Sequence, residues 1–333
     1  MMSIAVTLKN LIGRAHFAFP WGRRALSRRG VVLMLHRVLA SEHEAAWPHR
    51  RGMCIGRESF AQLLDWLRQH FDCVPLEQLL AQPAGVRPRV ALTFDDGWRD
   101  NFELAFPLLQ QHGIPASIFL STGLIGDAAQ PSRNFWWEII SDTLWRAPQS
   151  PAARRLLEAL RAIGAPAPRL LLQDEASHRR SRLLASYLMM LIRLPAAKLQ
   201  AIADALPVTQ TSHALDWEQV RDMEDSGLVR FGPHSVSHAI LTTLDDASLR
   251  AELADSHAAL QAHCRQPLPV YCYPYGIHDE RVRQAVAELG YRYALASQRG
   301  LLGPDSERLA LPRINVGGHA YLAWRLFRGA WAC

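Results

Sequence analysis

The chain has 333 residues, of which 49% are hydrophobic and 20% are charged, and its net charge is +6 at pH 7. These values exclude a largely disordered chain and suit one large α/β domain or two ordinary domains. Residues 1–30 combine arginines with apolar side chains, as in a helix that lies on an anionic membrane surface or packs on its own domain. The sequence has neither zinc-finger spacing nor an aromatic RNA-reading motif, so nucleic acid is not an expected partner.

Buried strands alternate with helices along most of the chain. Continuous apolar runs predict strands at residues 31–35, 90–94 and 116–120, and helical spacing of apolar side chains predicts helices at residues 59–71 and 102–112. Beyond a helical stretch, the same signals predict helices at 217–225, about 245–264 and 279–289, and strands at 228–231, 270–273, 293–296 and 309–316. This alternation predicts a mostly parallel sheet, in the form of a distorted (β/α)7-type barrel.

The alternation is interrupted between about residues 130 and 213, where the sequence is rich in Leu, Ala and Arg and is broken by prolines. We interpret this stretch as a helical insertion in a domain of residues 31–318. The basic, amphipathic segment 1–30 precedes this domain, and a helical tail, residues 319–333, follows it.

The five cysteines are scattered and form no Cys-x-x-Cys pair, which argues against a disulfide framework and against a cysteine-ligated metal. Residues 1–20 carry no clean signal peptide, and the apolar run at residues 183–192 is too short to span a bilayer. We therefore expect a cytoplasmic protein, with peripheral contact at an anionic inner membrane face as a further candidate property.

Two short segments at strand ends carry groups that bind metals and move protons. Residues 93–97 (TFDDG) place two neighbouring carboxylates after a strand, before a glycine that permits a tight turn. Residues 234–238 (HSVSH) place two histidines on one face if the segment forms a helical turn. Alone, either segment could be an ordinary loop. Together they supply two imidazoles and a carboxylate, as in catalytic zinc sites, and a second carboxylate free to accept a proton.

These segments resemble the first two signature motifs of the polysaccharide deacetylases, the NodB-homology or carbohydrate esterase family 4 group. Residues 273–276 (YPYG) resemble the third motif, and residues 33–37 and 115–120 resemble strands near the first. The resemblance implies a distorted barrel and a carbohydrate N-deacetylase. Such an enzyme would be a metal-dependent hydrolase that removes N-acetyl groups from amino sugars of a polysaccharide or lipid-linked glycan and releases acetate.

The resemblance also implies a role for each matching residue. Asp95 would be the general base, and Asp96, His234 and His238 would hold one divalent metal, with Zn²⁺ as the favoured ion. The backbone N–H of Tyr275 would help to stabilise the tetrahedral oxyanion.

The sequence departs from the family pattern in two places. The third motif ordinarily begins with an arginine, which is missing from residues 270–273 (VYCY), and Arg313 on a late strand is the candidate replacement. The late Leu-x-His motif that supplies the general acid is not evident. His36, at the end of the first strand, is the candidate substitute, and His319 is the weaker alternative. A structural role remains the alternative interpretation for Arg313 and for His36.

Two other functions stay open at this stage. The same site could serve a deformylase or another amidase that acts on a lipid-linked sugar. The two departures could instead indicate a catalytically weakened protein that binds a glycan without turning it over. A two-carboxylate glycosidase is a poorer candidate, because its carboxylates must flank the bond at roughly 5–9.5 Å, whereas Asp95 and Asp96 are adjacent.

Overall fold

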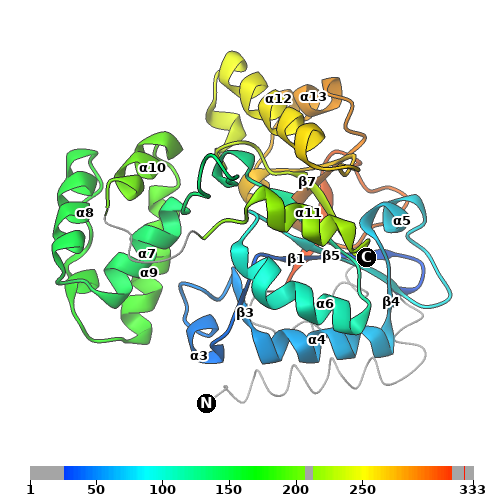
Figure 1. Cartoon of the computed structure of the whole chain (residues 1–333), viewed down its shortest axis with the longest axis horizontal. Helices are drawn as coiled ribbons and strands as arrows, with labels where there is room; N and C mark the ends of the chain where they lie inside the picture. The colour runs from blue at the N-terminus through cyan, green and yellow to red at the C-terminus, as the bar shows by residue number, and fades with distance from the viewer. Residues whose placement is uncertain (1–25, 207–212, 317–325, 327–333) are drawn as a thin grey trace.

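A computed structural model describes residues 26–206, 213–316 and 326 of the chain (Figure 1). The predicted N-terminal segment lies almost wholly outside the described residues, as does the predicted C-terminal tail except for Leu326. The interpretation of these two segments, and of the domain limits, therefore stays a prediction.

The described chain is built on one parallel sheet in the order β7-β6-β5-β1-β10-β9-β8, with β4 pairing β5 beside this path. The amide of Leu268, just before β8, donates to the carbonyl of Phe231 in β7 at 2.7 Å. The sheet therefore curves until its two ends nearly meet, which confirms the predicted distorted (β/α)7-type barrel. Its strands are β1 (Gly30–Leu35), β4 (Asp72–Cys73), β5 (Arg89–Phe94), β6 (Ala116–Leu120), β7 (Val229–Pro233), β8 (Val270–Cys272), β9 (Tyr293–Arg299) and β10 (Leu311–Asn315).

The central strand β1 is apolar along its whole length, as expected for a parallel strand that is covered on both faces. All six residues of β1 are buried, and Leu33 stands opposite Leu92 of β5 on one side and Ile314 of β10 on the other. Parallel pairing in this register brings the carboxyl ends of the strands to one edge of the sheet. Polar residues that directly follow the strands are therefore gathered at this edge.

Helices connect the strands and cover the barrel. Figure 1 shows α4 and α6 side by side, and α12 beside α13. The predicted helix at residues 102–112 begins as a π-helical turn at Asn101–Ala105, because Pro107 has no N–H to donate to the preceding turn. The other helices around the barrel are α4 (Arg57–His70), α5 (Leu76–Ala81), α6 (Phe106–His112), α11 (Trp217–Asp225), α12 (Asp246–His263) and α13 (Glu280–Glu288).

Four helices between β6 and β7 form a group to one side of the barrel (Figure 1). They pack around an apolar core of their own, to which Leu144, Leu156 and Leu184 contribute. Ser150 and Ser177 cap two of these helices by accepting from backbone N–H groups three residues further on. The four helices are α7 (Trp136–Arg146), α8 (Pro151–Ala162), α9 (His178–Leu191) and α10 (Ala196–Asp204).

Several short elements carry no periodic signal and were not predicted. They include a two-stranded parallel sheet of β2 (Arg37–Leu39) and β3 (Cys54–Gly56), and the one-turn helix α3 (Glu42–Ala45). Short 3-10 turns also occur, among them η5 (Pro274–Gly276) within the predicted third motif. Among the described residues, no helix is both long and apolar enough to cross a membrane.

Candidate functional site

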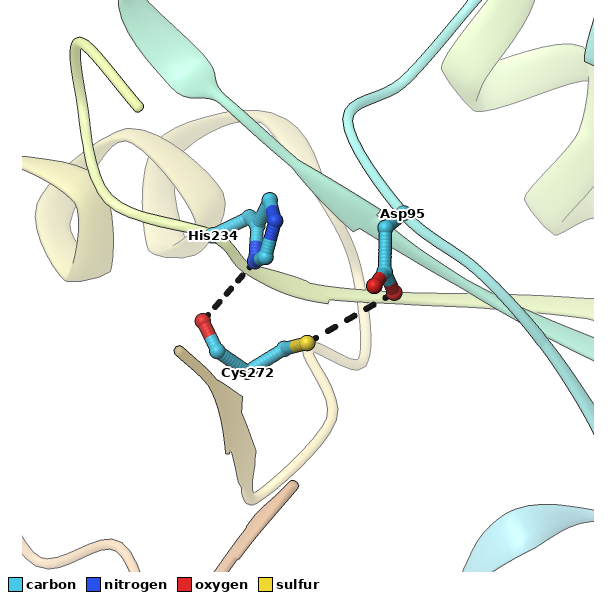
Figure 2. A group of neighbouring side chains, drawn as sticks. All are labelled: Asp95, His234 and Cys272. Carbon is cyan, nitrogen blue, oxygen red and sulfur yellow. Dashed lines mark hydrogen bonds between the residues drawn. The ribbon is translucent and has the colours of Figure 1, made fainter. Parts of the chain in front are cut away.

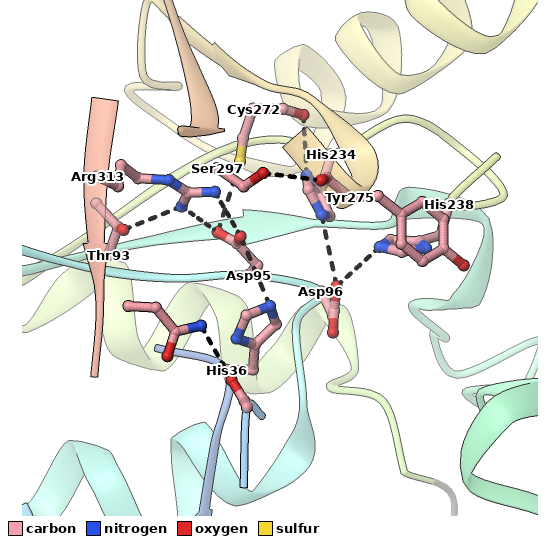
Figure 3. Close-up of polar contacts among 12 residues, drawn as sticks. His36, Thr93, Asp95, Asp96, His234, His238, Cys272, Tyr275, Ser297 and Arg313 are labelled. Carbon is pink, nitrogen blue, oxygen red and sulfur yellow. Dashed lines mark hydrogen bonds and ion pairs between the residues drawn. The ribbon is translucent and has the colours of Figure 1, made fainter. Parts of the chain in front are cut away.

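The residues singled out by the sequence come together at the carboxyl edge of the sheet (Figure 3). Asp95 and Asp96 follow β5, His36 follows β1, and His234 follows β7. The structure thus brings together His36, Asp95, Asp96, His234, His238, Tyr275 and Arg313, whereas His319 lies outside the described residues.

Arg313 and Asp95 form a buried ion pair. The two terminal guanidinium nitrogens of Arg313 donate to the two carboxylate oxygens of Asp95, each at 2.7 Å, and Nε donates to the carbonyl of Ala296 at 2.9 Å. Burial alone would raise the pKa of Asp95, but the adjacent guanidinium lowers it to about 2. Asp95 is therefore held as a carboxylate in one orientation.

Asp96 points away from Arg313 and towards two imidazoles (Figure 3). Its Oδ1 lies 3.1 Å from Nε2 of His238 and 3.5 Å from Nε2 of His234. Asp96 has a φ of 77°, in the left-handed region, so the backbone turns between the two carboxylates rather than remaining extended. Burial alone would raise the pKa of Asp96, but the imidazoles hold it well below its usual range.

The segment that carries the histidines is a loop and not a helical turn, so the condition under which helical spacing would place both histidines on one face is not met. Ser235 and His238 have φ values of 64° and 57°, and this pair of left-handed residues folds the chain back on itself. His234 and His238 still reach the same carboxylate, with their rings 4.9 Å apart. The sequence gives no sign of this geometry, because left-handed residues other than glycine follow no simple pattern.

The three side chains fit a divalent metal ion. One ligand atom of each of Asp96, His234 and His238 lies within 4.8 Å of the others, and all three residues are buried. Nδ1 of His234 is 2.9 Å from the carbonyl of Cys272, which makes Nδ1 the protonated nitrogen and leaves Nε2 with a free lone pair. Oδ1 of Asp96 is buried and accepts no hydrogen bond. Two imidazoles and a carboxylate are a donor set typical of catalytic zinc.

A second cluster, Asp95, His234 and Cys272, also places three ligand atoms close together (Figure 2). It suits a metal poorly, because both oxygens of Asp95 already accept from Arg313. Burial also raises the pKa of the Cys272 thiol, and its Sγ donates to Oδ1 of Asp95 at 3.5 Å. A metal ligand would have to be a thiolate. The chemistry therefore favours Asp96, His234 and His238.

His36 lies on the other side of Asp95 from Arg313 (Figure 3). Its Nε2 is 3.8 Å from Oδ2 of Asp95, and its backbone carbonyl accepts from the side chain of Asn101 at 2.8 Å. Burial lowers the pKa of His36, and its Nδ1 has no hydrogen-bond partner among the described residues. This position is within reach of a reacting group, and the acid role of His36 stays a prediction.

Tyr275 lies over His238, with the two rings 4.5 Å apart and nearly perpendicular. Its φ is 58°, and its carbonyl accepts from the Ser297 hydroxyl at 3.0 Å, which fixes this unusual backbone turn. Gly276 follows because an added Cβ there would approach the Ser297 amide to 2.2 Å. The turn keeps the Tyr275 backbone beside the metal ligands.

Sequence reasoning missed two residues that support the ligands. Trp98 is fully buried and donates from Nε1 to Oδ2 of Asp96 at 2.8 Å, which leaves Oδ1 directed at the histidines. Glu252 on α12 accepts from the amides of Val236 and Ser237 at 2.8 and 2.9 Å, and so holds the histidine loop. Neither contact is detectable in the sequence, because each depends on the tertiary fold.

The site opens into a cavity of about 450 Å³ between the barrel and the insertion. Trp98 and Trp137 line it, and the ring of Trp137 lies 4.8 Å from that of His238. An adjoining cavity of about 550 Å³ shares Tyr275 and His238 with the first. This space can hold a ligand of several rings, with one end at the two carboxylates.

The family model for polysaccharide deacetylases matches residues 83–294, which is more than half of the chain. The chain belongs to the polysaccharide deacetylase family. The resemblance drawn from the motifs is therefore confirmed. A protein of Bacillus subtilis (strain 168), YxkH, whose name assigns it provisionally to the polysaccharide deacetylases, is 20% identical over 267 residues. That match covers 79% of this chain but only 65% of the length of the relative.

Solved structures of deacetylases share the fold of this member of the family. The Streptococcus pyogenes deacetylase PplD, solved with acetate, superposes with a TM-score of 0.58 at 17% identity, over 91% of this chain and 98% of that one. IcaB from Ammonifex degensii gives 0.54 at 19% identity, over 90% and 97%. At these identities the likeness concerns the fold.

Proposed function

We propose that this protein is a metal-dependent hydrolase that removes N-acetyl groups from amino sugars of a polysaccharide or lipid-linked glycan, releasing acetate. The proposal depends on one observation: three buried ligand atoms within 4.8 Å of one another lie beside a carboxylate that a two-point ion pair holds in place. Membership of the family supports the reaction, and the cavity at the site supports a glycan as the substrate.

One divalent ion, with Zn²⁺ favoured by the donor set, would be held by Asp96, His234 and His238. Such an ion polarises a carbonyl and lowers the pKa of water towards ~7. This chemistry suits hydrolysis of an amide, which is otherwise a poor electrophile.

The protein's own groups divide the proton transfers between them. Arg313 keeps Asp95 ionised and oriented. Asp95 accepts a proton from the attacking water as the water oxygen bonds to the amide carbon. The Tyr275 N–H donates to the oxyanion of the tetrahedral intermediate. As the carbon–nitrogen bond breaks, Asp95 passes on the proton that it took from water, and His36, whose Nε2 lies 3.8 Å from Oδ2 of Asp95, gives it to the departing amine. Acetate and the free amino sugar leave.

The test uses N-acetylated chitooligosaccharide as the probe and compares acetate release with the metal content of the purified protein. Asp95→Asn is expected to keep its metal and lose about 10²–10⁴-fold in turnover, because only the proton acceptor is removed. His238→Ala is expected to lose both metal and activity. Equal acetate release by Asp95→Asn and the wild type would overturn the proposal.

The two alternatives give different results in the same assay. A deformylase would release formate from the N-formyl form of the same sugar faster than acetate from the N-acetyl form. A weakened glycan-binding protein would bind the oligosaccharide without turnover and would tolerate Asp95→Asn.

We also propose a cytoplasmic location with peripheral contact at the inner membrane face. Cell fractionation of the full chain at low and high salt tests this location.

A further inference from the structure

One wall of the active-site cavity is apolar and has no part in the proposed reaction. The cavity that contains Asp95, Asp96 and both histidines is also lined by one face of α9. The residues of that face recur at spacings of three and four, so they share one side of the helix. They are Ala185, Leu188, Met189 and Ile192.

Apolar side chains at this cavity are exposed to solvent, although apolar side chains are usually buried. The side chain of Met189 is 62% exposed, and that of Ile277, which lines the same cavity from the loop after η5, is 39% exposed. In the part of the chain that the structure describes, only four large apolar side chains are exposed, and these two both border the active-site cavity. Apolar side chains gathered at a binding cavity typically indicate contact with an apolar ligand.

The wall is not explained by the packing of the insertion. The core of the insertion takes Leu184, Tyr187 and Leu191 from a neighbouring face of α9, and Leu188 and Ile192 reach only the edge of that core. Met189 does not take part in that core. Met189 therefore faces the cavity without a structural partner that would account for its apolar character.

We propose that this wall receives a hydrocarbon chain attached to the amino sugar, so that the substrate is a lipid-borne N-acetyl amino sugar. The inference rests on the proposed function, because the sugar's amide must lie at Asp95 while the chain extends along α9. A polysaccharide would gain little from this wall, because its hydroxyl groups find no hydrogen-bond partner among these apolar side chains. A hydrocarbon chain would remove apolar surface from water on both partners.

Binding is measured by titration calorimetry with two probes, the methyl and octyl glycosides of N-acetylglucosamine, with the octyl glycoside kept below its micellar concentration. Each buried CH₂ contributes about fourfold in affinity, so the octyl glycoside is expected to bind at least ~10-fold more tightly even if few of its carbons are covered. Equal affinities for the two glycosides would overturn the inference.

Two neighbouring methionines provide a matched pair of variants. Met189 lines the cavity, whereas Met190 is 43% exposed on the same helix and does not line it. Met189→Asp is expected to remove most of the octyl preference, measured as the ratio of the octyl and methyl glycoside affinities of the same variant. Met190→Asp is expected to keep the preference. A preference that survives Met189→Asp, or that both variants lose equally, would count against the wall as the binding surface.

Acetate release from the same glycosides separates this inference from the proposed reaction. If the octyl glycoside binds more tightly through Met189 but neither glycoside is hydrolysed, the wall is supported and the reaction fails. If both are hydrolysed with equal kcat/KM and bound equally, the reaction is supported and the hydrocarbon site fails.

Discussion

Arg313 and Asp95 are 218 positions apart in the chain, and they meet as a buried ion pair in which each carboxylate oxygen accepts one hydrogen bond of 2.7 Å. The fork of the guanidinium matches the carboxylate at two points, so it fixes the direction of Asp95 as well as its charge. The third motif of this chain lacks its usual arginine. Arg313 of β10 stands next to the expected base, Asp95, in its place.

Replacing Arg313 is expected to damage turnover more than metal binding. Arg313→Met leaves Asp95 buried without its cation, so kcat should fall about 10²-fold as the base loses its orientation. The free energy of unfolding should fall by about 3–5 kcal/mol. Arg313→Lys keeps the charge but not the fork, and should give an intermediate loss. Acetate release, metal content and chemical denaturation of the three proteins check this. If Arg313→Met turned over substrate at the wild-type rate, Arg313 would have no role in catalysis.

Trp98 is expected to tune the affinity for the metal through Asp96. Trp98→Phe keeps the aromatic packing but removes the N–H that donates to Oδ2 of Asp96 at 2.8 Å. Loss of a hydrogen bond of this kind behind a ligand typically weakens metal binding about 10–100-fold. Competition with a chelator measures the change.

Trp136→Phe is the control for the Trp98 variant. Trp136 is also buried, but its Nε1 has no hydrogen-bond partner among the described residues. The control should bind metal as the wild type does. If both variants lose metal affinity equally, the effect comes from general packing and not from the bond to Asp96.

A buried cluster of charges joins the insertion to the barrel. Oε1 of Glu138 on α7 lies 2.6 Å from Arg37 and 2.7 Å from Arg50, and Arg37 also bonds to Asp100 at 2.7 Å. Glu138→Gln removes the negative charge that offsets the positive charges of Arg37 and Arg50. The variant should therefore lose about 3 kcal/mol of unfolding free energy at pH 7, as measured by urea denaturation.

The loss caused by Glu138→Gln should depend on pH. Burial alone would raise the pKa of Glu138, but Arg37 and Arg50 hold it well below its usual value. A carboxylate whose pKa is lower in the folded protein than in the unfolded chain stabilises the fold fully above its unfolded pKa of about 4.3. This contribution disappears as the pH falls towards the folded pKa. The difference between wild type and Glu138→Gln should thus shrink below about pH 4. A constant difference from pH 7 to pH 3 would contradict the assignment.

The strands, the barrel and the polar residues at the strand ends could be predicted from the sequence because they depend on local patterns. Apolar runs place the strands, and the residue after each strand must lie at the carboxyl edge. The pairing of Arg313 with Asp95 could be offered only as a candidate, because it depends on the register of β10 against β1. The loop conformation of His234 to His238 could not be predicted, since the spacing of the two histidines does not reveal the left-handed backbone of Ser235 and His238.

The histidine loop itself gives a last prediction, through Glu252. Its Oε2 accepts from the amides of Val236 and Ser237, between the two metal ligands, and Ser237 also donates from its hydroxyl. Glu252→Ala leaves these amides without their partner, so the loop should loosen and metal affinity should fall about 10-fold. Asp255→Ala, three residues further along α12 at the adjoining cavity, is the control and should bind metal normally. Unchanged affinity in Glu252→Ala would mean that the other contacts of the loop are enough to hold its shape, among them the hydrogen bonds that the Thr122 and Gly123 amides donate to the carbonyls of Ser235 and Val236.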